Sequence, residues 1–325
     1  MSKQLIAVIL GGASAERPVS LKTGAEVAKA IDRNQYDIVM LDGATENQLA
    51  KIDGEKFPSF ESYLADPNNS KPNLAFLALH GSFGEDGGIQ SYFDNIGLKY
   101  TFSDSKSSRL AMDKAAAKKA YQQAGIQTAD EIILENSQVD IDGIIEKLGL
   151  PVVVKPIEQG SSFGVSIIKN KEKLQLAIDE AFKFDKRVML EEYIKGIEIT
   201  VATVGNRDPE AMPVIEIRPK GKSEFFDYTA KYSESGCDEI CPAKIENEIA
   251  RKAQSIAILA HKTLGCSGIS RTDMIIQDET NNIYTLETNT IPGMTPASLL
   301  PKAAKAAGYS FSELIQKIIN LAFER

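Results

Sequence analysis

Apolar runs and helical patterns alternate over the first hundred residues of the chain. Residues 5–10 and 74–79 are continuous apolar runs typical of buried parallel strands, and residues 36–41 form a further predicted strand. Apolar residues follow at helical spacing in 19–31 and 89–96. Strand, glycine-containing loop and helix in this order predict a doubly wound α/β domain, in which ligands bind at the carboxyl ends of the strands.

Two residues with possible chemistry stand at these strand ends. Glu16 lies in the loop after the first strand, where it could bind an ammonium group or only favour the start of the next helix. His80 opens a glycine-rich loop after the strand at 74–79, and both a structural role and a ligand-binding role are open. The first loop is not Gly-x-Gly-x-x-Gly, so a dinucleotide site is not favoured.

The pattern changes after a short predicted strand at 98–102 and a polar stretch that marks a domain boundary. A helix is predicted at 111–124, and its lysines Lys114, Lys118 and Lys119 are by themselves typical of a solvated face. Lys155 interrupts an apolar strand at 151–156, and a lysine in such a position tends to face a partner or ligand because burying it unpaired is costly.

A glycine- and serine-rich loop, residues 158–164, joins this strand to the next one at 165–169. Its N–H groups and the hydroxyls of Ser161 and Ser162 could bind phosphate oxygens. The loop also matches the Gly-x-Ser-x-Gly of serine hydrolases, but a strand follows it instead of a helix. His261, the only histidine after Ser162, falls within a predicted helix at 245–264. A serine hydrolase is therefore not favoured, and the chain lacks the P-loop motif.

A hairpin near the end of the chain carries candidate metal ligands. Two strands at 271–277 and 283–289 flank a polar turn, with Asp273 on the first strand. Glu287 and Asn289 are two residues apart on the second strand, so they point to the same face. Carboxylate and amide oxygens suit Mg²⁺, although ordinary charges on a solvated strand face would give the same pattern.

Strands at 188–194 and 198–204 and a closing helix at 310–321 complete the outline. Residues 225–232 precede a polar loop, and Lys231 and Tyr232 beside such a loop suit a lid that closes over a site.

Length and composition narrow the function classes. A chain of 325 residues suits two or three domains, and a net charge of −8 argues against a general nucleic-acid binder. The three cysteines lack zinc spacing and suit reduced thiols. The apolar run at 5–10 is too short for a signal peptide, and no stretch approaches a membrane span. We therefore expect a soluble, cytoplasmic protein without a membrane or nucleic-acid partner.

Taken together, the motifs resemble those of the D-alanine–D-alanine ligases, which belong to the ATP-grasp family. They run in one register as Gly-Gly-x-Ser-x-Glu, Leu-His-Gly-x-x-Gly-Glu-Asp-Gly, Ala-Met-Asp-Lys, Val-Val-Lys-Pro, Gly-Ser-Ser-x-Gly-Val-Ser, Glu-Glu-Tyr-Ile-x-Gly-x-Glu, Asp-Tyr-x-Ala-Lys-Tyr, Arg-x-Asp and Glu-x-Asn-Thr-x-Pro-Gly-Met-Thr. The resemblance implies an α/β ATP-grasp fold with an N-terminal doubly wound parallel-sheet domain. The implied domains are 1–104, 105–190 and 191–325, with ATP between the second and third.

The resemblance also implies a role for individual residues. ATP would be bound by Lys114, Lys155, Ser161, Ser162, Glu191, Glu192, Tyr193, Ile194, Glu198 and Lys231. Two Mg²⁺, or Mn²⁺, would be held by Asp273, Glu287 and Asn289. The D-alanine substrates would meet Glu16, His80, Ser161, Tyr232 and Ser298, with Arg271 and the Gly293 N–H as oxyanion donors.

The implied reaction is ATP-dependent formation of D-alanyl-D-alanine through an acyl phosphate, for peptidoglycan precursor synthesis, in a homodimeric enzyme. Two alternatives remain: a ligase that takes D-serine or D-lactate second, and a nucleotide-binding regulator with a decayed site. Joint retention of the lysines, Arg271 and the metal ligands argues against the regulator. The chain departs from the family at Pro18, Gly88, Thr272 and Thr288, and Pro18 is the departure that could alter the first substrate site.

Overall fold

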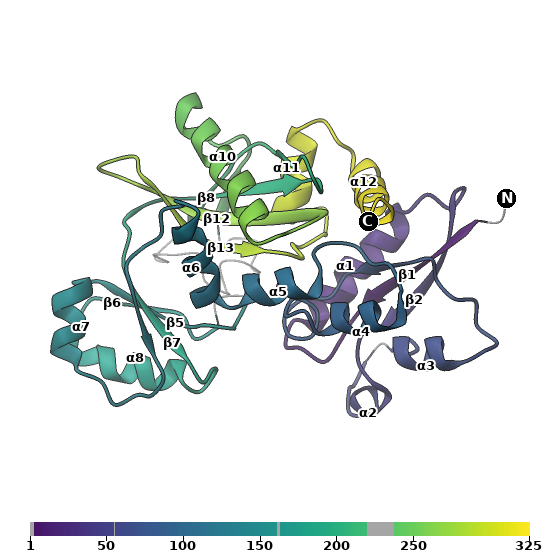
Figure 1. The fold of residues 1–325 in the computed structure, drawn as a ribbon, viewed down its shortest axis with the longest axis horizontal. Helices are drawn as coiled ribbons and strands as arrows, with labels where there is room; N and C mark the ends of the chain where they lie inside the picture. Colours follow the sequence, from purple (N-terminus) through teal and green to yellow (C-terminus); the bar gives the residue numbers. More distant parts are fainter. Residues whose placement is uncertain (1–2, 55, 161–162, 220–236) are drawn as a thin grey trace.

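The N-terminal part of the molecule is built on a parallel sheet, as the pattern predicts. The computed structural model describes residues 3–54, 56–160, 163–219 and 237–325. The sheet has the order β2-β1-β3 and consists of β1 (Gln4–Leu10), β2 (Tyr36–Asp42) and β3 (Leu74–Leu77). Helices α1 (Arg17–Ala30) and α4 (Gly88–Ile96) follow β1 and β3 (Figure 1). The polar stretch between β2 and β3 holds two short helices, α2 (Glu46–Leu49) and α3 (Phe60–Ala65).

Two predictions near the first boundary are wrong. The expected strand at 98–102 makes a single isolated bridge, Tyr100 to Ala75, because Phe102 has a positive φ of 72° that extended strands do not allow. The expected single helix at 111–124 is two helices, α5 (Ser105–Met112) and α6 (Lys114–Gln123). They break at Asp113, whose ψ is 96° and whose side chain caps α6 by accepting from the Ala116 N–H.

The middle part is an antiparallel sheet with its own core. Its order is β4-β7-β5-β6, formed by β4 (Glu131–Leu134), β5 (Val152–Pro156), β6 (Ser166–Ile168) and β7 (Val188–Glu192). Helices α7 (Ile141–Leu148) and α8 (Leu174–Ala181), the latter preceded by a 3₁₀ turn at Lys171–Lys173, bury their apolar faces against it. The phosphate loop candidate joins β5 to β6, so it lies between two strands as predicted.

The C-terminal part is a six-stranded sheet covered by helices. The order is β11-β10-β8-β12-β13, and β9 pairs with β8. The strands are β8 (Gly196–Val204), β9 (Glu210–Ala211), β10 (Ile215–Pro219), β11 (Cys237–Ile240), β12 (Ile269–Gln277) and β13 (Ile283–Asn289). Helix α10 (Asn247–Thr263) packs on this sheet, followed at the end of the chain by α11 (Leu299–Ala306) and α12 (Phe311–Phe323).

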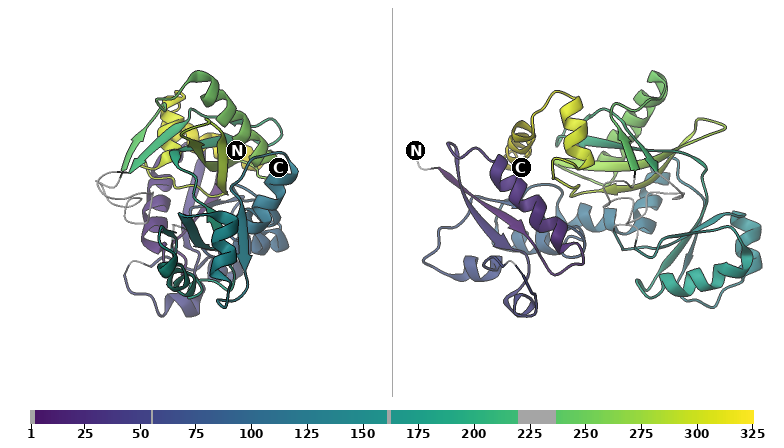
Figure 2. Two further views of the ribbon diagram at one scale, coloured as in Figure 1. Left: turned by 90° about the vertical axis from the view of Figure 1, so that its left-hand side faces the viewer. Right: turned by 180° about the vertical axis from the view of Figure 1, so that it is seen from behind.

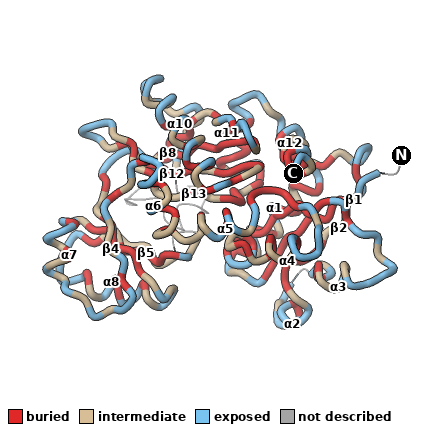
Figure 3. The backbone as a smooth tube through the Cα atoms, viewed as in Figure 1, coloured by how far each residue is buried: buried red, intermediate tan, exposed pale blue. Residues whose placement is uncertain are grey.

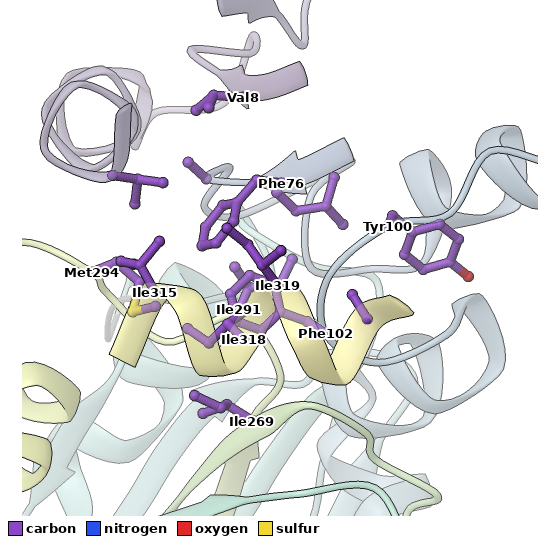
Figure 4. Close-up of a cluster of buried hydrophobic side chains, with 14 of the residues drawn as sticks. Val8, Phe76, Tyr100, Phe102, Ile269, Ile291, Met294, Ile315, Ile318 and Ile319 are labelled. Atoms are coloured by element: carbon purple, nitrogen blue, oxygen red, sulfur yellow. The ribbon is translucent and has the colours of Figure 1, made fainter. Parts of the chain in front are cut away.

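Helix α12 joins the first and third parts in one apolar core. It lies beside α1, as Figure 2 also shows from behind. Its residues Ile315, Ile318 and Ile319 face Phe76 of the N-terminal sheet on one side and Ile269 of β12 on the other (Figure 4). The buried segments therefore run continuously from the N-terminal sheet into the C-terminal one (Figure 3).

Two expectations about the chain as a whole can be compared with the structure. Cys237, Cys241 and Cys266 are all free thiols. Within the described ranges, no helix combines the length and apolar character needed to cross a bilayer.

Truncating Ile319 tests the importance of this shared core. We expect Ile319→Ala to lower the free energy of unfolding by about 2–5 kcal/mol, because a fully buried side chain would leave a cavity. Urea denaturation measures the loss. Leu176→Ala, at a side chain 63% exposed, is the matched control and should change the same quantity by less than about 0.5 kcal/mol. Equal effects of the two variants would contradict the assignment.

Candidate active site

Strand register brings four candidate residues to one face of the C-terminal sheet. In the antiparallel pair β12–β13, Arg271 lies opposite Asn289 and Asp273 lies opposite Glu287. Because side chains alternate along a strand, these four point to the same side, and the sequence had predicted this for Glu287 and Asn289. Strand β8 adds Thr200 opposite Asp273 on its other edge. The register shifts immediately after Asp273, at a β-bulge.

Asp273 and Glu287 on this face each contact a cationic side chain. Arg271 donates from Nε and Nη2 to the two oxygens of Asp273, at 2.9 and 2.8 Å. Thr200 donates to the same carboxylate at 2.5 Å. Burial works against the charge of Arg271, but Asp273 and the further carboxylates raise its pKa overall. Glu287 forms an ion pair with Lys114 Nζ at 3.2 Å. The charges of Asp273 and Glu287 are therefore balanced by those of Arg271 and Lys114.

This donor set fits a hard divalent cation. Asp273 and Glu287 supply carboxylate oxygens from opposite positions of one strand pair, and Asn289 supplies an amide oxygen that accepts from the Ile291 N–H at 3.2 Å. In the part of the chain that the structure describes, three or more His, Cys, Asp or Glu side chains do not gather into a metal site. The candidate set has only two carboxylates, which suits Mg²⁺ because that ion usually keeps waters or phosphate oxygens in its shell.

Lys114 reaches this face from helix α6. It is the first residue after the capping Asp113, and its Nζ also donates to the Gln159 carbonyl at 2.8 Å. Gln159 belongs to the loop between β5 and β6, so Lys114 links that loop to Glu287. The sequence indicated a solvated lysine face on this helix, which is wrong for Lys114 and Lys118, because both are buried, and right for the exposed Lys119.

Lys155 and Glu191 form a buried ion pair on neighbouring strands β5 and β7. The second oxygen of Glu191 accepts from Lys118 at 2.5 Å. Removal from water raises the pKa of Glu191, but Lys155 and Lys118 more than offset this and lower it overall. Lys155 thus faces a partner, as expected of a lysine within an apolar strand. Lys118 is the functional candidate that the sequence pattern missed.

The remaining candidates for the nucleotide lie on the segment from β7 to β8. Glu192 accepts from the Asp130 N–H at 3.0 Å, Tyr193 is half-buried and Ile194 is buried. Glu198 on β8 lies opposite Ile275 of β12, and therefore on the same sheet face as Asp273. These residues belong to the segment that runs from β7 of the middle sheet to β8 of the C-terminal sheet.

The N-terminal part presents Glu16 and His80 at the carboxyl ends of β1 and β3. Glu16 is buried and stands at the N-cap of α1, and its carbonyl accepts from the Val19 and Ser20 N–H groups. His80 is buried and its Nε2 shares a hydrogen bond of 2.9 Å with the Thr23 hydroxyl. Burial lowers the pKa of His80, although the Glu16 carboxylate opposes that shift. His80 is therefore neutral at physiological pH.

The N-terminal carboxylates lie close to the phosphate loop candidate. A Cβ placed on Gly160 would be 3.6 Å from Glu16 Oε2 and 4.0 Å from Glu85 Oε2. The charge of Arg271 acts on the pKa values of both His80 and Glu85. Loops from the N-terminal and middle sheets therefore meet the charged face of the C-terminal sheet.

Gly293 and Ser298 follow β13 and lie together. A Cβ on Gly293 would be only 3.0 Å from the Ser298 hydroxyl oxygen, so a larger residue there would crowd the serine. That hydroxyl lies 2.8 Å from the hydroxyl of Thr295, and Ser298 precedes α11 as its N-cap residue. Ser161, Ser162, Lys231 and Tyr232 lie outside the residues that the structure describes.

Comparisons with known proteins give the family of the chain. Family models of the D-ala D-ala ligase N-terminus and C-terminus match residues 5–103 and 120–320. The D-alanine–D-alanine ligase of Syntrophobacter fumaroxidans is 43% identical over 323 residues, 99% of this chain and 98% of the relative. The chain belongs to the D-alanine–D-alanine ligase family.

Solved structures of this family share the fold over the whole chain. The crystal structure of the D-alanine–D-alanine ligase from Bacillus anthracis complexed with ATP has a TM-score of 0.79 and 33% identity, covering 99% of this chain and 97% of that one. The VanG D-Ala:D-Ser ligase from Enterococcus faecalis has a TM-score of 0.83 and 32% identity, covering 99% and 100%. The architecture is the ATP-grasp fold, as the motifs implied.

Three of the four departures of this ligase from the usual family motifs have local explanations. Pro18 lies in the first turn of α1, where a missing N–H costs no helical hydrogen bond. Thr272 and Thr288 point to the face opposite the metal ligands, where their hydroxyls lie 3.0 Å apart. The buried Tyr121 of α6 donates to Thr288 at 2.7 Å, so the two threonines replace apolar contact with a satisfied polar network.

Glu85 is a second ionisable residue that the motif assignment left without a role. Its Oε2 accepts from the Gly81 N–H at 3.0 Å. Removal from water and the nearby Glu16 carboxylate raise its pKa from the ordinary 4.5 to about 8, against the opposing effects of the Gly81 N–H and Arg271. Glu85 therefore holds a proton in the ligand-free enzyme at neutral pH.

Glu85→Gln should reveal this proton in the pH dependence of stability. A carboxyl whose pKa is raised on folding contributes most below its ordinary pKa, and the contribution is lost as pH rises through the folded value. The wild type should therefore lose stability relative to Glu85→Gln between about pH 4.5 and 8. Urea denaturation of both proteins across this range measures the difference. A difference that does not vary with pH would contradict the shift, and Glu16→Gln should move the change to lower pH.

Proposed function

We propose that this ligase uses ATP to join two D-alanine molecules into D-alanyl-D-alanine for peptidoglycan precursors. The observation that carries the proposal is the single sheet face that unites Arg271, Asp273, Glu287 and Asn289 with Lys114 from the nucleotide side. Relatives and solved structures named for this reaction match the full length of the chain and support it. One of those structures is titled as a complex with ATP.

The need for ATP follows from the chemistry of a carboxylate. Its oxygen does not leave when an amine attacks, so the carboxylate of the first D-alanine must be activated. Attack of that oxygen on the γ-phosphorus of ATP gives an acyl phosphate and releases ADP. The amine of the second D-alanine then attacks the acyl carbon, and phosphate leaves. The proton lost from the second ammonium balances this step.

The residues of the C-terminal face serve the two charged stages. Lys114 and Lys155 would bind the phosphates, and Asp273, Glu287 and Asn289 would hold Mg²⁺, or Mn²⁺. Bound Mg²⁺ supplies charge neutralisation at the transferring phosphate. Arg271 uses Nε and Nη2 on Asp273, which leaves its Nη1 donors for the tetrahedral oxyanion. The Gly293 N–H is the second donor we assign to it.

The N-terminal loops would hold the first D-alanine. Glu16 lies buried at a strand end, where its carboxylate can pair with the substrate ammonium. Neutral His80, whose ring is hydrogen-bonded to Thr23, would lie beside the same substrate. Ser298, placed by Thr295, would meet the second substrate. Ser161, Ser162, Lys231 and Tyr232 keep the roles that the family motifs imply for them.

The same proposal extends to the organisation of the enzyme. We assign domains to residues 1–104, 105–190 and 191–325, each with one of the sheets as its main element. We also infer a cytoplasmic homodimer, which is the common state of the family.

Replacing a metal ligand tests the proposed chemistry. Glu287→Gln should lower ADP release in the presence of ATP, D-alanine and Mg²⁺ by more than about 100-fold, because several kcal/mol of charge stabilisation depend on the bound ion. A coupled assay for ADP measures the rate. Glu279→Gln, which removes an exposed carboxylate from the turn of the same hairpin, should leave the rate unchanged. Near-native turnover of Glu287→Gln would overturn the metal assignment.

Competition between second substrates tests specificity. With D-alanine, D-serine and D-lactate present together near neutral pH, we expect D-alanyl-D-alanine as the main product. Mass spectrometry measures the amount of each product. A dominant D-alanyl-D-serine or D-alanyl-D-lactate product would reassign the second substrate, while absence of ADP release from the wild type would overturn the ligase proposal.

A further inference from the structure

Lys118 is a fully buried lysine of α6 whose ammonium group reaches β4 and β7 of the middle sheet. Its Nζ donates to the Ala129 carbonyl at 2.7 Å and to Glu191 at 2.5 Å, and it forms an ion pair of 3.0 Å with Glu131. Two of the three donors of the ammonium group are therefore used in hydrogen bonds, and both acidic neighbours balance its charge. Lys119, the next residue along the helix, is exposed.

The contacts of Lys118 continue into the proposed nucleotide site. Glu191 accepts from Lys118 through Oε1 and from Lys155 through Oε2. Three successive ion pairs therefore connect Glu131, Lys118, Glu191 and Lys155 in that order. These are two acidic and two basic groups, and the set is neutral. Glu191, Lys118 and Lys155 are buried, which makes each charge depend on the partners that remain.

A bound nucleotide would change this balance at one end. Lys155 can donate to a phosphate only by sharing its ammonium with that new acceptor, and its hold on Glu191 then weakens. If Lys155 were the only cation at Glu191, that sharing would leave a buried carboxylate poorly compensated, which is strongly unfavourable. With Lys118 on the other oxygen, Glu191 keeps a full opposite charge.

We propose that Lys118 is a positioning residue for ATP: it neutralises Glu191, so that Lys155 is free to bind phosphate. The inference rests on the proposed function, specifically on phosphate binding by Lys155. The combined effect of the two lysines keeps Glu191 charged in the ligand-free enzyme despite its burial. An apolar residue would fill the position of Lys118 at lower cost if packing between α6 and the sheet were its whole purpose.

A pair of variants separates this role from a structural one. Lys118→Met should weaken ATP binding at least tenfold, measured by isothermal titration calorimetry with ATP and Mg²⁺, because Glu191 would then compete with phosphate for Lys155. In steady-state assays the KM for ATP should rise by a similar factor, with kcat at saturating ATP within about twofold of the wild type. Lys119→Met, the matched control, should change neither value.

Repeating the Lys118 substitution in a Glu191→Gln variant separates the two roles of Lys118. In Glu191→Gln there is no carboxylate to neutralise, so adding Lys118→Met should change ATP affinity by less than about threefold. A purely structural Lys118 predicts the same loss of affinity in both backgrounds, and that result would overturn the proposal. So would a folded Lys118→Met enzyme that binds ATP as the wild type does. If Lys118→Met alone does not fold, a loss of ATP affinity of more than about threefold on adding Lys118→Met to Glu191→Gln would still overturn the proposal.

The wild type separates failure of this inference from failure of the proposed function. A wild-type enzyme that does not bind ATP would overturn both. A wild type that binds ATP and makes D-alanyl-D-alanine, with equal losses in the two backgrounds, would overturn only the role of Lys118.

Discussion

The pairing of β12 with β8 and β13 is the constraint on which the site depends. It places Arg271, Asp273, Glu287 and Asn289 on one face and the threonines between them on the other. A slip of one residue would turn every one of these side chains to the opposite face. The hydrogen bonds of Thr288 with Tyr121 and with Thr272 oppose such a slip, because a shifted register would leave three buried hydroxyls without these partners. Polar groups on the face that packs against α6 thus help to fix the register that positions Arg271, Asp273, Glu287 and Asn289.

Charge balance is the second principle of the site. Asp273 is paired with Arg271, Glu287 with Lys114, and Glu191 with Lys118 and Lys155. None of these pairs needs to be stabilising in itself, since desolvation offsets most of the attraction. Under the proposed function, phosphate and Mg²⁺ would supply the opposite charges that these side chains lose when their ion pairs open. Binding then replaces one compensated arrangement with another and avoids exposing a bare buried ion.

The sequence predicted those parts of the structure that depend on local pattern. Alternation placed Glu287 and Asn289 on one face, and the strand after the Gly-Ser-Ser loop excluded a hydrolase elbow. It did not predict the burial of Lys118, because its partners Glu131 and Glu191 come from strands that contact α6 only in the folded chain. The raised pKa of Glu85 likewise depends on Glu16, which is 69 residues away in sequence. The break between α5 and α6 was detectable from sequence, since Asp113 is a good N-cap residue within an otherwise continuous helical pattern.

The distribution of apolar cores determines how the three parts are joined. Helix α12 gives the N-terminal and C-terminal sheets one core, which holds the loops of Glu16 and His80 at a constant position relative to Arg271. The middle sheet has a separate core, and its links to the catalytic face include the polar contacts of Lys114 with Gln159 and Glu287. Polar contacts between separate cores resist relative movement less than a shared apolar core does. A nucleotide that contacts both Lys155 and the candidate metal ligands would therefore add a further connection between the middle sheet and the rest of the enzyme. ATP would then complete the proposed site as well as supply its phosphate.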